Sequence, residues 1–170
     1  AAVPRGQPIT AKSSHKITPP EGLARSRGGA FATRAITDEP IEAEATFDVW
    51  SFGCVMYELA ARQSLFLANG DDSLEVFELE RLANWNVGDL ASAVEALQAA
   101  LRGVSDRALV LAVVDLISWC LQPEPLDRPQ SMRDVLSHRF FMYDGQMRMS
   151  ALHIAAALNL QDDLELAIRS

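Results

Sequence analysis

Apolar positions at helical spacing predict a central helix over residues 46–62. Its apolar side chains fall on nearly every face of the helix: Val49, Trp50, Phe52, Cys54, Val55, Met56, Tyr57 and Leu59. A helix that is apolar on all sides is expected in the middle of a domain. Thr46 is the expected N-cap, and Asp48 suits the positive end of the helix dipole. Gly53 costs a helix about 1 kcal/mol relative to Ala, so we expect another backbone to lie against it.

Four later apolar patterns predict further helices. Residues 74–82 combine apolar and acidic positions, as in a partly exposed helix. Within residues 84–106, an amphipathic helix is expected, with one face made of Leu90, Val94, Leu97 and Leu101. Residues 109–121 form an apolar stretch that Pro123 and Pro125 stop, and a shorter helix is expected within residues 127–141. The pattern therefore predicts a mainly helical fold.

The composition indicates a globular protein with one core. Of the 170 residues, 49% are hydrophobic and 22% are charged, which is ordinary for a soluble domain. Cys54 and Cys120 both lie in predicted helices and fit reduced core thiols better than a disulfide or metal site. No signal peptide or membrane-spanning run is evident, so we expect a cytoplasmic location. Because the chain begins with Ala1 and ends within a helical pattern, we expect a fragment of a longer protein.

Charge is divided unevenly along the chain. Residues 1–36 carry six basic side chains and one acidic one, whereas the other 134 carry nine basic and twenty-two acidic ones. The basic head is rich in Gly, Ala, Ser and Pro and poor in apolar residues, which predicts a mobile segment. It lacks the dense basic clustering and interleaved aromatic residues of a nucleic-acid interface. We therefore expect no nucleic-acid partner.

The run Asp48-Val49-Trp50-Ser51-Phe52-Gly53 resembles the DxWSxG signature that opens the central helix of the protein-kinase C-lobe. In that family the aspartate is buried and accepts hydrogen bonds from the backbone of the catalytic loop. The resemblance thus implies that Asp48, Trp50 and Gly53 are structural anchors. The plainer interpretation is that Asp48 is only a first-turn acid, worth about 0.3–1 kcal/mol.

The later sequence WCLQPEPLDRPQSMRDVLSHRFF resembles the end of the same fold. The resemblance implies that Arg128 is the buried arginine that pairs with a glutamate ending the activation segment. A planar, bidentate guanidinium suits this pairing. Thr18-Pro19-Pro20-Glu21 resembles the Ala-Pro-Glu end of that segment, and Glu39-Pro40 is the competing candidate. We prefer Glu21, because a longer exposed loop before the central helix costs little entropy.

Two hydroxyl groups lie in the implied activation segment. Ser14 falls seven residues before Glu21, where serine/threonine kinases usually carry a threonine, and Thr18 is closer to the glutamate. Both residues are candidate phosphorylation sites, and the alternative is a flexible segment that is merely rich in hydroxyl groups.

The last residues resemble a different family. Ser150-Ala151-Leu152-His153-Ile154-Ala155-Ala156 is similar to the TPLHxAA opening of an ankyrin repeat. Residues 164–168 would continue as its second helix. About two thirds of a repeat is present, and such a piece has no neighbouring repeat on which to stack. We expect His153 to be structural rather than a ligand.

Motifs for phosphoryl transfer are missing from this sequence. A kinase needs a Gly-rich loop, a strand lysine, an HRD-type aspartate and a DFG-type aspartate for Mg²⁺. None of them is present, so we expect no catalytic, cofactor-binding or metal-binding residues here and no activity of this chain alone. ATP and Mg²⁺ would belong to the full-length kinase.

The sequence therefore predicts three parts. Residues 1–45 form a flexible head with an activation-segment remnant, residues 46–142 form the lower half of a kinase C-lobe, and residues 143–170 form a partial ankyrin repeat with a helix pair. The implied function is the C-terminal portion of an ATP-dependent kinase acting on protein Ser/Thr or Tyr. The alternative is a non-catalytic kinase-like and ankyrin module that binds a partner protein.

Overall fold

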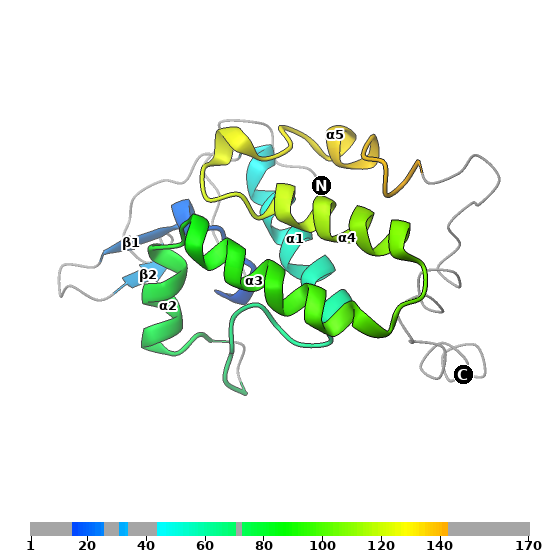
Figure 1. Cartoon of the computed structure of the whole chain (residues 1–170). Helices are drawn as coiled ribbons and strands as arrows, with labels where there is room; N and C mark the ends of the chain where they lie inside the picture. The colour runs from blue at the N-terminus through cyan, green and yellow to red at the C-terminus, as the bar shows by residue number, and fades with distance from the viewer. Residues whose placement is uncertain (1–14, 26–30, 34–43, 71–72, 143–170) are drawn as a thin grey trace, which may run out of the picture.

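The computed structural model describes residues 15–25, 31–33, 44–70 and 73–142. The described chain is mainly helical, which confirms the predicted fold class. Helix α4 lies across α1 and runs beside α3, while α5 lies over α4 and α2 packs beside a small hairpin (Figure 1). None of the helices in these ranges is long and apolar enough to cross a bilayer.

Helix α1, Ala45–Ala61, is the central element. It contacts α3, α4, α5 and the N-terminal 3₁₀ turn η1, His15–Ile17. The expected N-cap at Thr46 was wrong: Glu44 occupies the cap position, and Thr46 is a buried residue of the first turn. The helix ends at Arg62, whose φ of 56° lies in the left-handed region that closes many helices.

Burial of α1 is incomplete. Val49, Trp50, Cys54 and Tyr57 are buried, as expected for a central helix. The opposite side is exposed along a stripe that consists of Asp48, Val55 and Leu59, with Val55 at 45% and Leu59 at 47% of full exposure. The apolar pattern therefore overstated how much of the helix surface is covered by the described residues.

Helices α3 and α4 pack against the buried side of α1. Helix α3, Val87–Ala100, begins with a capping box in which Asn86 and Asp89 exchange hydrogen bonds with each other's backbone. Helix α4, Arg107–Cys120, is capped by Asp106, whose carboxylate accepts from the backbone N–H of Leu109 at 3.0 Å. A 3₁₀ turn, η4 (Leu101–Gly103), joins the two helices. The amphipathic helix expected within residues 84–106 is therefore present as α3.

The end of the described chain is less helical than expected. In place of one helix within residues 127–141, there is a 3₁₀ turn η5, Pro125–Asp127, and the short helix α5, Met132–Leu136. Arg128, between them, is extended, because a residue before proline avoids helical dihedrals. Val135 and Phe140 anchor this segment in the core.

Part of the predicted mobile head has regular structure. After η1 comes a second 3₁₀ turn, η2 (Pro20–Gly22), and then strand β1, Leu23–Arg25. Strand β1 pairs antiparallel with β2, Phe31–Thr33, with Ala24 opposite Ala32. Strand β2 contacts helix α2, Val76–Ala83. The hairpin occupies part of the long insert that the choice of Glu21 implied.

Candidate functional site

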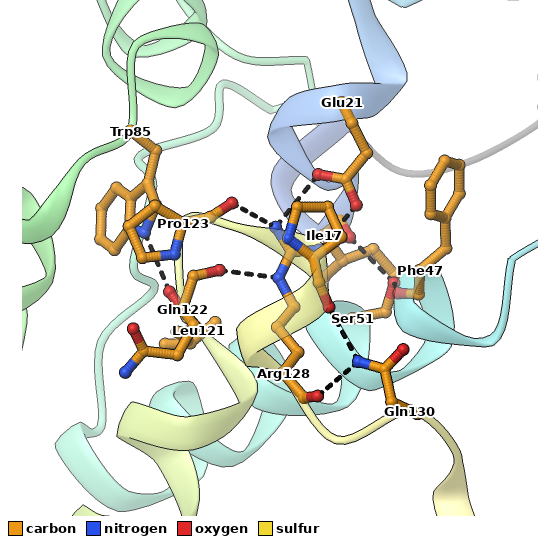
Figure 2. A network of polar contacts seen from close by, with 11 residues as sticks. Ile17, Glu21, Phe47, Ser51, Trp85, Leu121, Gln122, Pro123, Arg128 and Gln130 are labelled. Atoms are coloured by element: carbon orange, nitrogen blue, oxygen red, sulfur yellow. Dashed lines mark hydrogen bonds and ion pairs between the residues drawn. The ribbon is translucent and has the colours of Figure 1, made fainter.

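A buried arginine is the centre of the candidate site. Arg128 is 2% exposed and donates four hydrogen bonds (Figure 2). Its Nη1 donates to Glu21 Oε1 at 2.6 Å, and its Nη2 donates to Glu21 Oε2 at 3.1 Å. The remaining bonds run from Nε to the Gln122 carbonyl at 2.7 Å and from Nη2 to the Pro123 carbonyl at 2.9 Å. The guanidinium thus makes a two-pronged ion pair and also closes the turn after α4.

The indole of Trp50 forms one wall of this site. The guanidinium carbon of Arg128 lies 4.8 Å from the Trp50 ring centroid, which is a cation–π geometry. The ring of Trp85 meets Trp50 edge to face at 5.7 Å, and its Nε1 donates to the Leu121 carbonyl at 3.0 Å. Trp50 belongs to α1, and Trp85 lies in the chain between α2 and α3. These two tryptophans therefore link the arginine to α1 and to the connection between α2 and α3.

Gly53 sets the approach of α4 to α1. A Cβ placed on Gly53 would come within 2.8 Å of the Cys120 Cβ and 2.9 Å of Leu121 Cδ2. The sequence predicted another backbone against Gly53, whereas the nearest atoms belong to side chains at the end of α4. In the turn that follows α4, the carbonyl groups of Gln122 and Pro123 accept from Arg128, and that of Leu121 accepts from Trp85 Nε1.

The segment that carries Glu21 is fixed to α1 by a serine. Ser51 Oγ lies 2.9 Å from the Ile17 carbonyl oxygen and 3.0 Å from the Phe47 carbonyl oxygen, and its proton can be donated to either. Lys16 Nζ adds a longer ion pair with Glu58 at 3.9 Å. Ser51 belongs to the same six-residue run as Trp50 and Gly53. The first two turns of α1 therefore hold both the arginine and the segment of its carboxylate partner.

The other residues predicted for the site are divided. Thr18 is buried at 6% exposure, two residues before the η2 turn that carries Glu21. Asp48 is exposed, and among the described residues no hydrogen bond to its carboxylate is formed. Ser14 and the competing candidate Glu39 lie outside the described residues. The structure therefore brings together Glu21, Arg128 and Trp50, and leaves Asp48 apart from them.

A second charged pair was missed in the sequence. Glu78 in α2 is 3% exposed and accepts hydrogen bonds from the Leu67 backbone N–H at 3.2 Å and from Arg81 Nη1 at 3.1 Å. The Arg81 guanidinium lies over the rings of Phe66 and Trp85, at 5.1 and 5.6 Å from their centroids. In the sequence, the only sign of this pair is that Glu78 and Arg81 are three residues apart on one predicted helix. Such spacing usually indicates a solvent-exposed helix face and does not predict a buried carboxylate.

The thiols next to the site are chemically quiet. Burial raises the pKa of Cys120 to about 12, and the nearby Arg128 only partly offsets this effect. Burial also raises the pKa of Cys54, again against the opposing charge of Arg128. Both groups stay protonated at neutral pH, and a protonated thiol is a poor nucleophile. These two thiols are therefore not activated, and what the described contacts of the cluster do is hold α1, the Glu21 segment and the turn after α4 together.

Comparisons with known proteins identify one family. The family model described as Protein kinase domain matches residues 31–141. The matched residues include helices α1 to α5 and Arg128, and the match begins after Glu21. No curated protein and no solved structure matches the chain.

Proposed function

Since the chain belongs to the protein kinase domain family, we propose that it is the C-terminal portion of an ATP-dependent protein kinase. In this proposal residues 46–142 are the lower part of the C-lobe, and residues 15–21 are the end of the activation segment. Residues 143–170 would begin an ankyrin repeat. The full-length kinase would transfer phosphate from ATP and Mg²⁺ to a protein Ser/Thr or Tyr.

The observation that carries this proposal is the Glu21–Arg128 pair. The two residues are 107 positions apart, and the pair combines a bidentate geometry, a fully buried guanidinium and a tryptophan wall. Separating the pair would leave an uncompensated charge, which is costly. The turn that carries Glu21 and the segment that carries Arg128 are therefore held in a fixed relative position. A kinase needs this kind of fixed platform, because phosphoryl transfer depends mainly on positioning of the substrate and the phosphates.

Asp48 has a role in the proposal that needs residues beyond this chain. Its exposed carboxylate stands in the first turn of α1, one turn of helix away from Ser51 and two residues before Trp50. In the full-length kinase, backbone N–H groups of the catalytic loop would donate to this carboxylate. Asp48 would then hold the catalytic loop on α1, as Ser51 holds the segment of Glu21.

Thr18 and Ser14 remain candidate phosphorylation sites under this proposal. Thr18 is buried in this structure, so its modification would require the segment to leave α1. Ser51 and Lys16 tie that segment to α1 through the contacts given above. Phosphorylation of Thr18 would therefore compete with the ordered position of Glu21.

A phosphate-transfer assay tests the proposal. The coding sequence immediately upstream is expected to supply the HRD-type and DFG-type motifs, and a polypeptide that includes it is expected to transfer radiolabelled phosphate from ATP to generic protein substrates. The 170-residue chain, at the same concentration, is expected to transfer none. An upstream sequence without these motifs, or a folded longer polypeptide without transfer, would instead support the non-catalytic module that binds a partner protein.

A further inference from the structure

Two arginines line one hollow on the surface of the helical core. Helices α3 and α4 lie side by side (Figure 1), and the hollow, of about 400 Å³, opens between them next to η4. Arg102, in η4, and Arg107, the first residue of α4, both line it and are both exposed. The surface of the hollow is more polar than apolar. These features suit a ligand that carries negative charge.

The charges of these two arginines are not neutralised by the described part of the chain. In that part, ion pairs occupy Arg81, Arg128 and Arg139, and none of them involves Arg102 or Arg107. No hydrogen bond ties either of the two side chains to another described residue. Both guanidinium groups therefore keep their full set of N–H donors for a ligand.

The position of Arg107 is not explained by the stability of its own helix. The N-terminal end of a helix carries a partial positive charge, so a cation in the first turn is unfavourable. Asp106, the N-cap of α4, has the charge that suits this end, whereas Arg107 next to it has the opposite one. Arg107 thus adds to the positive potential at this end of α4, in a chain whose net charge is −8.

One acidic side chain also lines the hollow. Glu95 is exposed and precedes Arg102 by seven residues, which corresponds to about 10 Å along a helix. The separation leaves the guanidinium of Arg102 free of a direct contact with this carboxylate. The positive charge is therefore concentrated at the end of the hollow next to η4.

A phosphate monoester is the anion that fits two free guanidinium groups best. Each guanidinium is a planar fork that donates two parallel hydrogen bonds to an anion. A phosphate monoester carries about −1.5 to −2 charges at neutral pH and three strong acceptor oxygens, so it can bind both forks together. A single carboxylate has two oxygens and one charge, which one fork already satisfies.

The size and the α4 wall of the hollow favour a phosphate group that is attached to a peptide. The hollow is several times larger than a phosphate ion. Val110, Leu111 and Val114 contribute apolar surface from α4, and Leu111 is 51% exposed. A peptide brings apolar neighbours of the phosphorylated residue that can cover Leu111, whereas a free phosphate ion brings none.

We propose that the hollow between α3 and α4 binds a phosphorylated segment of a partner protein. Arg102 and Arg107 pair with the phosphate, and an apolar residue next to the phosphorylated one covers Leu111. Clusters of arginine recognise phosphorylated motifs by the same chemistry in other binding modules. This inference is independent of whether the longer protein is an active kinase.

Fluorescence anisotropy with the 170-residue chain tests the binding. The probe is a fluorescein-labelled heptapeptide whose central phosphoserine has a leucine on each side, and the control is the same peptide with serine. Because the chain has a net charge of −8, non-specific electrostatics would weaken binding of the phosphopeptide. We expect the phosphopeptide to bind about tenfold more tightly than the serine peptide. Equal affinities, or tighter binding of the serine peptide, would overturn the proposal.

Competition distinguishes the two sources of phosphate. Unlabelled phosphopeptide is expected to displace the probe at a concentration about tenfold below that needed for inorganic phosphate, because only the peptide covers Leu111. Inorganic phosphate that competes as well as the phosphopeptide would overturn the proposal and would assign the hollow to the free ion.

Substitutions locate the binding. Arg102→Gln with Arg107→Gln is expected to weaken binding of the phosphopeptide about tenfold, and Arg102→Lys with Arg107→Lys about threefold, because lysine keeps the charge and loses the fork. The matched control is Arg133→Gln, an exposed arginine of α5 outside the hollow, which is expected to change the affinity less than about twofold. Circular dichroism is expected to show unchanged helix content, since all three arginines are exposed. Unchanged affinity in the glutamine double variant, or an equal loss in Arg133→Gln, would overturn the proposal.

Discussion

Replacement of Arg128 by alanine removes the centre of the site and tests its energetics. The change deletes four hydrogen bonds, exposes one face of Trp50, and leaves the Glu21 carboxylate and two carbonyl groups without their donor. Loss of one partner from a buried ion pair costs about 3–5 kcal/mol. Because the Glu21 side chain keeps 26% exposure and can recover some hydration, we expect a loss of about 3 kcal/mol in the free energy of unfolding.

Urea denaturation followed by tryptophan fluorescence measures this loss, since Trp50 and Trp85 both lie at the site. The matched control is Arg133→Ala, an exposed arginine in α5, which is expected to change stability by less than about 0.5 kcal/mol. A double-mutant cycle with Glu21→Gln isolates the pair itself and is expected to give a coupling of about 1–3 kcal/mol. A loss below about 1 kcal/mol for Arg128→Ala would refute the assigned pairing.

Three further changes probe the elements around this pair. Gly53→Ala is expected to destabilise the chain by about 1–3 kcal/mol in the same urea assay, because the added methyl overlaps the end of α4 at Cys120; a neutral result would mean that the helices can separate freely. Ser51→Ala is expected to cost about 1 kcal/mol and to speed trypsin cleavage after Lys16, whereas unchanged proteolysis would show that the hydroxyl does not hold this segment. Burial raises the pKa of Cys120 from 9.0 to about 12, so the unfolded chain loses this thiol proton at a lower pH than the folded chain does. The free energy of unfolding should therefore fall as the pH rises from about 9 toward 12. Cys120→Ala should lessen this fall, and an equal fall in both proteins would contradict the shift.

The helices could be predicted because their signals are local. The spacing of apolar residues located α1, α3 and α4 to within a few positions, and Pro123 and Pro125 marked where α4 had to stop. Cap positions were less predictable: Thr46 has better cap chemistry than Glu44, yet its burial keeps it inside the first turn. Tertiary packing therefore placed Glu44, and not Thr46, at the N-cap of α1.

Exposure was the feature that the sequence could not provide. Val55 and Leu59 have the same chemistry as their buried neighbours, and only the arrangement of the other helices leaves them uncovered. The exposure of Asp48 has the same origin. The three-residue strands of the hairpin were also missed, because strands this short carry almost no periodic signal.

The candidate site was partly within reach of sequence reasoning. Arg128, Glu21 and Trp50 were named from their motifs, and the structure places their side chains in contact. The contribution of Trp85 was not foreseen, because it depends on a contact with Leu121, 36 positions away. Ser51 was part of a quoted motif, but its bond to Ile17 is likewise a long-range contact that no local pattern reports.

The most direct test of the central claim compares one substitution in two polypeptides. Asp48→Asn is expected to change the unfolding free energy of the 170-residue chain by less than about 0.5 kcal/mol, since this carboxylate is exposed. In the polypeptide extended upstream, where a catalytic loop would donate to Asp48, the same change is expected to cost about 1.5–3 kcal/mol. Equal effects in the two polypeptides would contradict the proposal that α1 carries the catalytic loop of a kinase.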